Sequence, residues 1–154
     1  MEVVFTDTHD TLLDGRYLIL RRLGQGAFGE VFLTRHVGLG VYRAVKRIRK
    51  SKDVHNTRRK EADALKNLRH TSLPIIYDID EDDVYFYIVE EYIEGISLSE
   101  YVRDRTRLAQ DETCSVIMSI CTVLSYMQTQ AGLLHLDIKP DNVLLTEDGV
   151  IFIS

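Results

Sequence analysis

Three closely spaced glycines constrain how this 154-residue chain can fold. They belong to the run Leu23-Gly24-Gln25-Gly26-Ala27-Phe28-Gly29-Glu30-Val31. Glycine lets a backbone approach a phosphate closely and direct its N–H groups at it. The same glycines also fit a structural turn or a dinucleotide-binding loop, but the latter has a helix directly after it, whereas residues 31–33 are strand-like. The order therefore favours a glycine-rich hairpin that lies over a nucleotide.

The order of the predicted elements is typical of an α+β fold, with a boundary near Gly95. Before this boundary we predict one helix at 54–69 and strands at 17–23, 30–37, 41–48, 73–79 and 84–92. After it we predict helices at 97–105 and 111–129, followed by strands at 143–146 and 150–153. Ser97 with Glu100 fits a capping box that begins the first of these two helices, and Gly132 ends the second.

Composition and charge exclude several classes of protein. The net charge of −5 argues against a strongly basic nucleic-acid-binding protein. No apolar run approaches the roughly 20 residues of a membrane span, and residues 1–14 lack the basic-then-apolar order of a signal peptide. Cys114 and Cys121 lie in one predicted helix, about 10.5 Å apart along its axis, which is too far for a disulfide bond. We therefore expect two buried free thiols in a reducing, cytoplasmic compartment.

Charge is distributed unevenly along the chain. Between Arg35 and Arg69 there are twelve Lys or Arg residues against three acidic ones, which fits a solvated face better than a partner-binding patch. The acidic run 80–83 separates two apolar stretches and lacks the glycine turn of a calcium loop. It therefore predicts a hairpin turn rather than a metal site.

A lysine and a glutamate in the first half of the chain each need a partner of opposite charge. Ala44 and Lys46 share one face of a predicted strand, so Lys46 faces the core if Ala44 does. Glu61 lies on the apolar stripe of the predicted helix at 54–69. An ion pair between Lys46 and Glu61 would satisfy both groups, and the alternative is two solvated side chains.

The most specific motif is the polar run His135-Leu136-Asp137-Ile138-Lys139-Pro140-Asp141-Asn142. Apolar residues at 133–134 and 143–145 hold it at both ends. Within six residues, Asp137 provides a base or proton acceptor, Lys139 a phosphate partner and Asn142 a metal ligand. A plain connecting loop would not need these three groups in this order.

Together, these stretches resemble the protein kinase family in order and spacing, over residues 17–154. The resemblance implies a five-stranded N-terminal lobe with one helix at 17–94, after an extension at 1–16, and the first part of a helical C-terminal lobe at 95–154. It implies a serine/threonine kinase that uses ATP and Mg²⁺ to phosphorylate proteins. The alternatives are a pseudokinase that binds ATP without transfer, and a small-molecule kinase of similar fold, such as an aminoglycoside or choline phosphotransferase.

The resemblance also implies a role for each site residue. Asp137 would accept or orient the proton of the substrate hydroxyl. Lys139 lies two residues after Asp137, a spacing similar to that in serine/threonine kinases. Lys46 would hold the α- and β-phosphates and pair with Glu61, while Asn142 would bind Mg²⁺. Residues 91–93 would form the hinge whose backbone bonds the adenine edge. The implied nucleotide contacts are Leu23, Gly24, Gln25, Gly26, Ala27, Phe28, Gly29, Val31, Ala44, Lys46, Glu91, Ile93 and Leu144.

Three features depart from the family pattern. Leu136 stands where many kinases carry an Arg that pairs with a phosphorylated activation loop, which suggests activity that is not switched in that way. Glu90 falls at the gate behind the adenine, where an apolar residue is usual, unless the register of the strand at 84–92 is shifted by one. The chain ends at Ser154, and we expect Asp-Phe-Gly within about three residues of it in a longer parent chain.

The last departure has consequences for the chain taken alone. Without Asp-Phe-Gly and the activation loop, we expect residues 1–154 to be inactive. The helix at 111–129 would also expose part of its apolar stripe, so we expect self-association through it. The predicted stripe consists of Cys114, Ile117, Ile120, Cys121 and Leu124.

Overall fold

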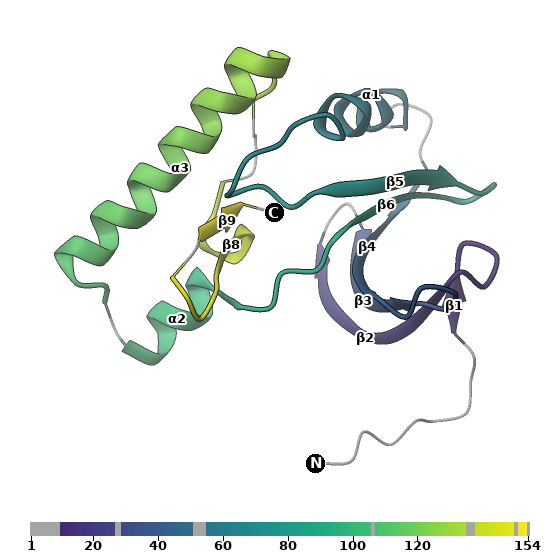
Figure 1. Cartoon of the computed structure of the whole chain (residues 1–154), viewed down its shortest axis with the longest axis horizontal. Coiled ribbons are helices and arrows are strands. Elements are labelled where there is room, and N and C mark those ends of the chain that lie inside the picture. The colour runs from purple at the N-terminus through teal and green to yellow at the C-terminus, as the bar shows by residue number, and fades with distance from the viewer. Residues whose placement is uncertain are drawn as a thin grey trace.

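Figure 1 shows the chain in a computed structural model, which describes residues 10–26, 29–50, 55–105, 107–134, 138–149 and 151–153. A curled antiparallel sheet and one helix form the first half. Two further helices and a small three-stranded sheet form the second half. The predicted α+β character is therefore confirmed, with strands dominating before Gly95 and helices after it.

The first sheet has six strands in the order β1-β2-β3-β4-β6-β5, every neighbouring pair antiparallel. Five of these strands were predicted from the sequence. The short strand β1 was not, because its two residues are too few to show the alternation that indicates a strand. The strands are β1 (Thr11–Leu12), β2 (Tyr17–Gly26), β3 (Gly29–His36), β4 (Tyr42–Arg49), β5 (Ile76–Glu81) and β6 (Tyr85–Glu91).

One face of this sheet contains the core of the first half. Alternate residues of neighbouring strands meet there and are at most 7% exposed. The cluster consists of Leu12, Tyr17, Phe32, Val45, Tyr87 and Val89. The predicted acidic turn is a hairpin turn between β5 and β6, where the Asp82 carboxylate accepts hydrogen bonds from the amides of Val84 and Tyr85.

The helix α1 (His55–Leu65) lies over β5, to which an ion pair between Arg59 and Glu81 joins it. It ends four residues before the predicted end at residue 69. A turn follows in which the Leu68 amide donates to the Leu65 carbonyl at 3.0 Å. Leu68 was predicted in this helix and Leu73 in the following strand. Both instead pack against Val123 and Met127 in the second half of the chain.

The second half begins with a linker and two helices, α2 (Leu98–Arg105) and α3 (Gln110–Ala131). The capping box is confirmed: the Ser97 hydroxyl accepts from the Glu100 amide at 3.2 Å, and the Glu100 carboxylate accepts from the Ser97 amide at 3.0 Å. Gly132 ends α3 in the left-handed conformation at φ 63°. No helix in the described part of the chain combines the length and the apolar character that crossing a membrane requires.

The small sheet completes the second half beside α3 (Figure 1). Its order is β7-β8-β9, and a single 3₁₀ turn, η1, precedes β8. The bounds are β7 (Ile96–Ser97), η1 (Pro140–Asn142), β8 (Val143–Leu145) and β9 (Ile151–Ile153).

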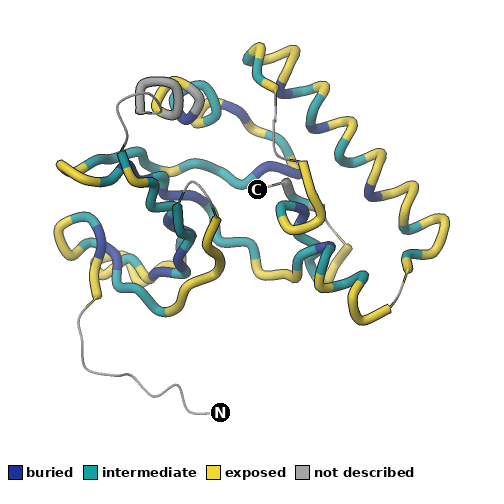
Figure 2. The backbone as a smooth tube through the Cα atoms, turned by 180° about the vertical axis from the view of Figure 1, so that it is seen from behind, coloured by how far each residue is buried: buried dark blue, intermediate teal, exposed yellow. Residues whose placement is uncertain are grey.

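The buried face of α3 differs from the predicted one. Val116, Val123 and Met127 are buried against both halves of the chain, whereas Cys114 and Cys121 are exposed. Figure 2 shows the buried and exposed segments alternating along this helix. The prediction of two buried thiols is thus wrong. Ile120 of the predicted stripe does pack against both core clusters, so packing against Leu68 and Val143 turns the buried face only partly away from the predicted one.

The exposed side of α3 predicts self-association of this chain. Ile117 and Met118 are 53% and 67% exposed and adjoin both cysteines on the helix surface. We expect oligomers in analytical ultracentrifugation under reducing conditions, and a shift toward monomer in the double variant Ile117→Lys and Met118→Lys. Gln128→Lys adds a charge at another exposed position of α3 and should leave the distribution unchanged. A monomer of the parent chain at all concentrations would contradict the prediction.

Candidate functional site

Three of the predicted site residues, Val31, Ala44 and Lys46, share one face of the first sheet. Directly opposite residues of antiparallel strands project to the same side. Val31 pairs with Lys46, and Ala44 pairs with Glu90. Since Ala44 and Lys46 alternate with the core residue Val45, all four share the face opposite the core. Glu90 is therefore on the same face as Lys46.

The ammonium group of Lys46 is paired with Glu90. Their Nζ and Oε1 atoms lie 3.2 Å apart, and the side chains are 26% and 8% exposed. The predicted partner Glu61 belongs to α1, but its side chain lies outside the described residues, so the Lys46–Glu61 pair stays a prediction. The sequence signal for the observed pair was present, because Glu90 stood where the resemblance implies an apolar residue.

The glycine-rich hairpin is formed by the ends of β2 and β3. Gly24 pairs with Val31 and Gly26 with Gly29, while Ala27 and Phe28 lie outside the described residues. A Cβ on Gly29 would overlap the carbonyl oxygen of Arg47. The backbone of Gly29 also has a φ of +154°, which residues with a side chain rarely adopt. A Cβ on Gly24 or Gly26 would have no neighbour within 4 Å. The fold itself thus requires glycine only at the third position.

An ion pair holds the base of this hairpin. Nη2 of Arg47 on β4 donates to the Glu30 carboxylate on β3 at 2.6 Å. The guanidinium also lies 4.9 Å from the ring centres of both Phe32 and Tyr85. Hydrogen bonding from Arg47, reinforced by Arg22, lowers the pKa of Glu30 below its ordinary value against a smaller opposing effect of burial. The strand that follows the glycines is therefore tied to β4 close to Lys46.

The predicted hinge connects the two halves. The Glu91 amide donates to the Ile75 carbonyl at 2.8 Å, and the Glu91 carboxylate accepts from the Ile75 amide at 3.2 Å. Further along the linker, a Cβ on Gly95 would overlap the carbonyl oxygen of Leu145 on β8. The linker is thus fastened at both ends. Sequence reasoning used Gly95 only as a boundary and missed this close approach.

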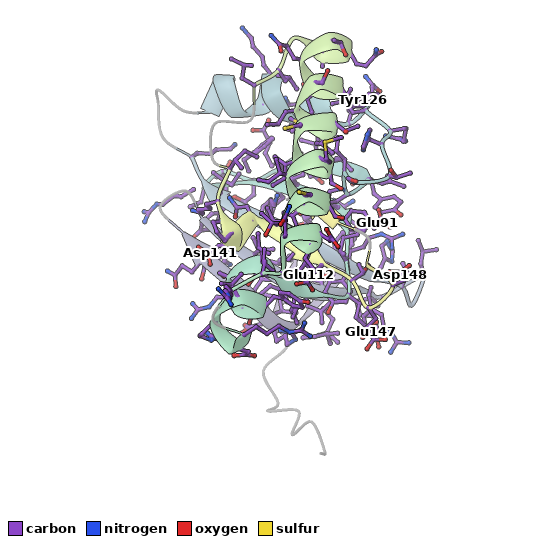
Figure 3. The ribbon with its side chains drawn as sticks, turned by 90° about the vertical axis from the view of Figure 1, so that its left-hand side faces the viewer. Glu91, Glu112, Tyr126, Asp141, Glu147 and Asp148 are labelled. Atoms are coloured by element: carbon purple, nitrogen blue, oxygen red, sulfur yellow. The ribbon has the colours of Figure 1, made fainter. Side chains whose placement is uncertain are left out.

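The structure describes the second part of the polar motif. Residues 135–137, and with them Asp137, lie outside the described residues. The backbone N–H of Asn142 donates to the backbone carbonyl of Lys139 at 2.9 Å across η1. The Asp141 carboxylate accepts from the Ser99 hydroxyl of α2 at 2.7 Å, and Figure 3 shows Asp141 beside that helix. Val143, which follows the motif, is 1% exposed and anchors it as predicted, whereas Leu134 before the motif is 67% exposed, so that part of the prediction is wrong.

Leu144 and Leu23, two of the predicted nucleotide contacts, lie on β8 and β2. Leu144 on β8 pairs with Ser97 of β7 and Phe152 of β9 and is partly buried. Leu23 on β2 is 37% exposed.

A cavity of about 440 Å³ lies elsewhere, between α1 and β5, and contains none of the predicted site residues. Within the described ranges, no three His, Cys, Asp or Glu side chains gather into a metal site.

Comparison with known proteins identifies what the chain is similar to. The family model described as protein kinase domain matches residues 17–154. Serine/threonine-protein kinase PrkC of Bacillus subtilis is 32% identical over 146 residues, covering 92% of this chain and 22% of the relative. Serine/threonine-protein kinase D of Synechocystis is 31% identical over 144 residues, covering 86% and 28%. Sperm motility kinase 2B of Mus musculus is 31% identical over 136 residues, covering 88% and 28%. The chain thus spans between 22% and 28% of the length of these relatives.

Proposed function

This chain belongs to the protein kinase family, and on that premise we propose that it forms the nucleotide-binding part of a serine/threonine protein kinase. The reaction is transfer of the γ-phosphoryl group of ATP to a protein hydroxyl. The observation that carries the proposal is the placement of Lys46 with Val31 and Ala44 on one face, next to the glycine-rich hairpin. The names of the matched relatives and Lys139, two residues after Asp137, support the serine/threonine type.

The proposed nucleotide site uses the face of the sheet opposite the core, together with the hinge. The ammonium group of Lys46 would contact the α- and β-phosphates under the hairpin. Glycines at 24 and 26, which the fold does not require, support close approach of the backbone to these phosphates. The backbone at 91–93 would bond the adenine edge. The residues that would enclose the adenine are Leu23, Val31, Ala44 and Leu144.

Asn142 would hold the Mg²⁺ ion that the family uses. Its amide oxygen is a ligand that Mg²⁺ accepts, and Mg²⁺ is commonly bound through one or two protein groups together with substrate phosphates. When bound, Mg²⁺ neutralises charge on the phosphates.

Asp137 and Lys139 would act on the transfer step. Asp137 would orient the attacking hydroxyl and accept its proton, and Lys139 would contact the transferred phosphoryl group. The hydrogen bond from Ser99 to Asp141 and the burial of Val143 support a rigid loop at this point. We assign residues 17–94 to the N-terminal lobe and residues 95–154 to the start of the C-terminal lobe of a cytoplasmic kinase.

A nucleotide titration combined with a phosphorylation assay tests this function. We expect the full-length protein to bind ATP in the presence of Mg²⁺ and to transfer radiolabelled phosphate to casein on serine or threonine. Binding without transfer to casein or any small acceptor would favour the pseudokinase. Transfer to an aminoglycoside or choline, but not to protein, would favour a small-molecule kinase. Absence of ATP binding would contradict the proposal.

A further inference from the structure

Glu90 is a buried carboxylate on the face that carries Lys46. We propose that Glu90 is a positioning residue, which orients the ammonium group of Lys46 toward the nucleotide phosphates from within the sheet. This inference rests on the proposed function and adds a residue to it. It starts from the 3.2 Å ion pair between the two side chains and from the burial of Glu90.

The geometry of the sheet fixes the two side chains relative to each other. Lys46 lies opposite Ile88 on β6, and Glu90 lies opposite Ala44 on β4, so the two charged residues are diagonal neighbours across one strand pair. The ladder between β4 and β6 runs without a bulge from Arg43 to Arg49. Both charged residues therefore extend from one continuous hydrogen-bonded support.

Burial makes the interaction directional. The Glu90 side chain is 8% exposed and that of Lys46 is 26% exposed, so the carboxylate lies deeper than the ammonium group. A carboxylate in such surroundings needs a compensating charge, which Lys46 supplies. An ammonium group has three N–H donors. One donor directed inward at Glu90 leaves others for phosphate oxygens on the more exposed side.

Pairing inside the sheet has a consequence for helix α1. A pair between Lys46 and Glu61 would connect a strand to a helix and would depend on where the helix sits. The pair with Glu90 connects two hydrogen-bonded strands and does not depend on the position of α1. Lys46 is therefore held in place by the sheet itself. Without Glu90, the flexible side chain of Lys46 would sample other rotamers, and its ammonium group would move away from the phosphates.

The test compares ATP with adenosine in the full-length protein. Adenosine lacks phosphates, so a residue that acts through Lys46 should affect ATP alone. We expect Glu90→Gln to weaken ATP binding about tenfold, with adenosine affinity unchanged. In the Lys46→Met background, Glu90→Gln should cause no further loss of ATP affinity. The control Glu81→Gln removes an ion-paired carboxylate from β5 of the same sheet and should leave both affinities unchanged.

Two other binding results would reject the inference. An equal loss for ATP and adenosine would make Glu90 a wall of the base site, and no loss for either ligand would make the pair dispensable. If Glu90→Gln fails to fold, Glu90→Asp keeps the charge but shortens the side chain, and it should weaken ATP binding selectively. If the parent binds no ATP, the proposed function fails and the inference with it. If the parent binds ATP and the variants do not differ, only the inference fails.

Discussion

Asp137→Asn is expected to lower the rate of phosphoryl transfer by at least about 10²-fold while ATP affinity stays within several-fold of the parent. The substitution keeps the shape of the side chain but removes the carboxylate that would orient the attacking hydroxyl. Lys46→Met should also abolish transfer, but it should weaken ATP binding as well, because it removes a phosphate contact. It also leaves Glu90 buried without its ammonium partner. The two variants therefore separate the transfer step from nucleotide placement.

Nucleotide titration and single-turnover kinetics on the full-length protein measure both effects. Asp141→Asn is a matched control, since Asp141 lies in the same motif but is bonded to Ser99 of α2. It should retain more transfer activity than Asp137→Asn. Transfer by Asp137→Asn at nearly the parental rate would show that Asp137 is not catalytic. The interpretation of residues 135–142 as the catalytic loop would then be wrong.

Gly29→Ala is expected to destabilise the protein by about 2 kcal/mol. The added Cβ would overlap the Arg47 carbonyl oxygen and lie 3.0 Å from its carbon, and both atoms belong to the backbone of β4. A strand inside a sheet cannot move away as a side chain can, so β3 would have to shift. The shift would also disturb the Glu30–Arg47 ion pair at the base of the hairpin.

Gly26→Ala is the matched control for this prediction. Its Cβ would have no neighbour within 4 Å, so urea unfolding should show a change in free energy of less than about 0.5 kcal/mol. ATP binding should nevertheless weaken, because the new methyl group occupies the side proposed for the phosphates. Equal unfolding free energies for Gly29→Ala and Gly26→Ala would contradict the steric argument.

Local features of this fold were predictable because they depend on neighbours in the sequence. The capping box of Ser97 and Glu100 and the end of α3 at Gly132 involve residues within one or two turns of each other. The alternation that puts Ala44 and Lys46 on one face follows from strand geometry alone. The residue types in these short stretches were sufficient for each prediction.

The buried face of α3 was not predictable in the same way. The predicted stripe of Cys114, Ile117, Ile120, Cys121 and Leu124 follows helical spacing, and so does the buried one of Val116, Ile120, Val123 and Met127. Both stripes satisfy the periodicity equally well. The choice depends on Leu68 and Leu98 from other elements, which pack against Val123 and Val116 respectively. Local pattern thus identified the helix but not its rotation about its own axis.

The site shows the same division between sequence and tertiary structure. The sequence by itself determined the glycine-rich hairpin, the strand that carries Lys46 and the polar motif ending at Asn142, because each is a local pattern of residue types. It left open whether Lys46 pairs with a carboxylate or is solvated. Only the tertiary structure decided that Glu90 contacts Lys46, because the register between β4 and β6 sets which distant residues become diagonal neighbours. That register is fixed by burial of Val45 and Val89 on the opposite face of the sheet.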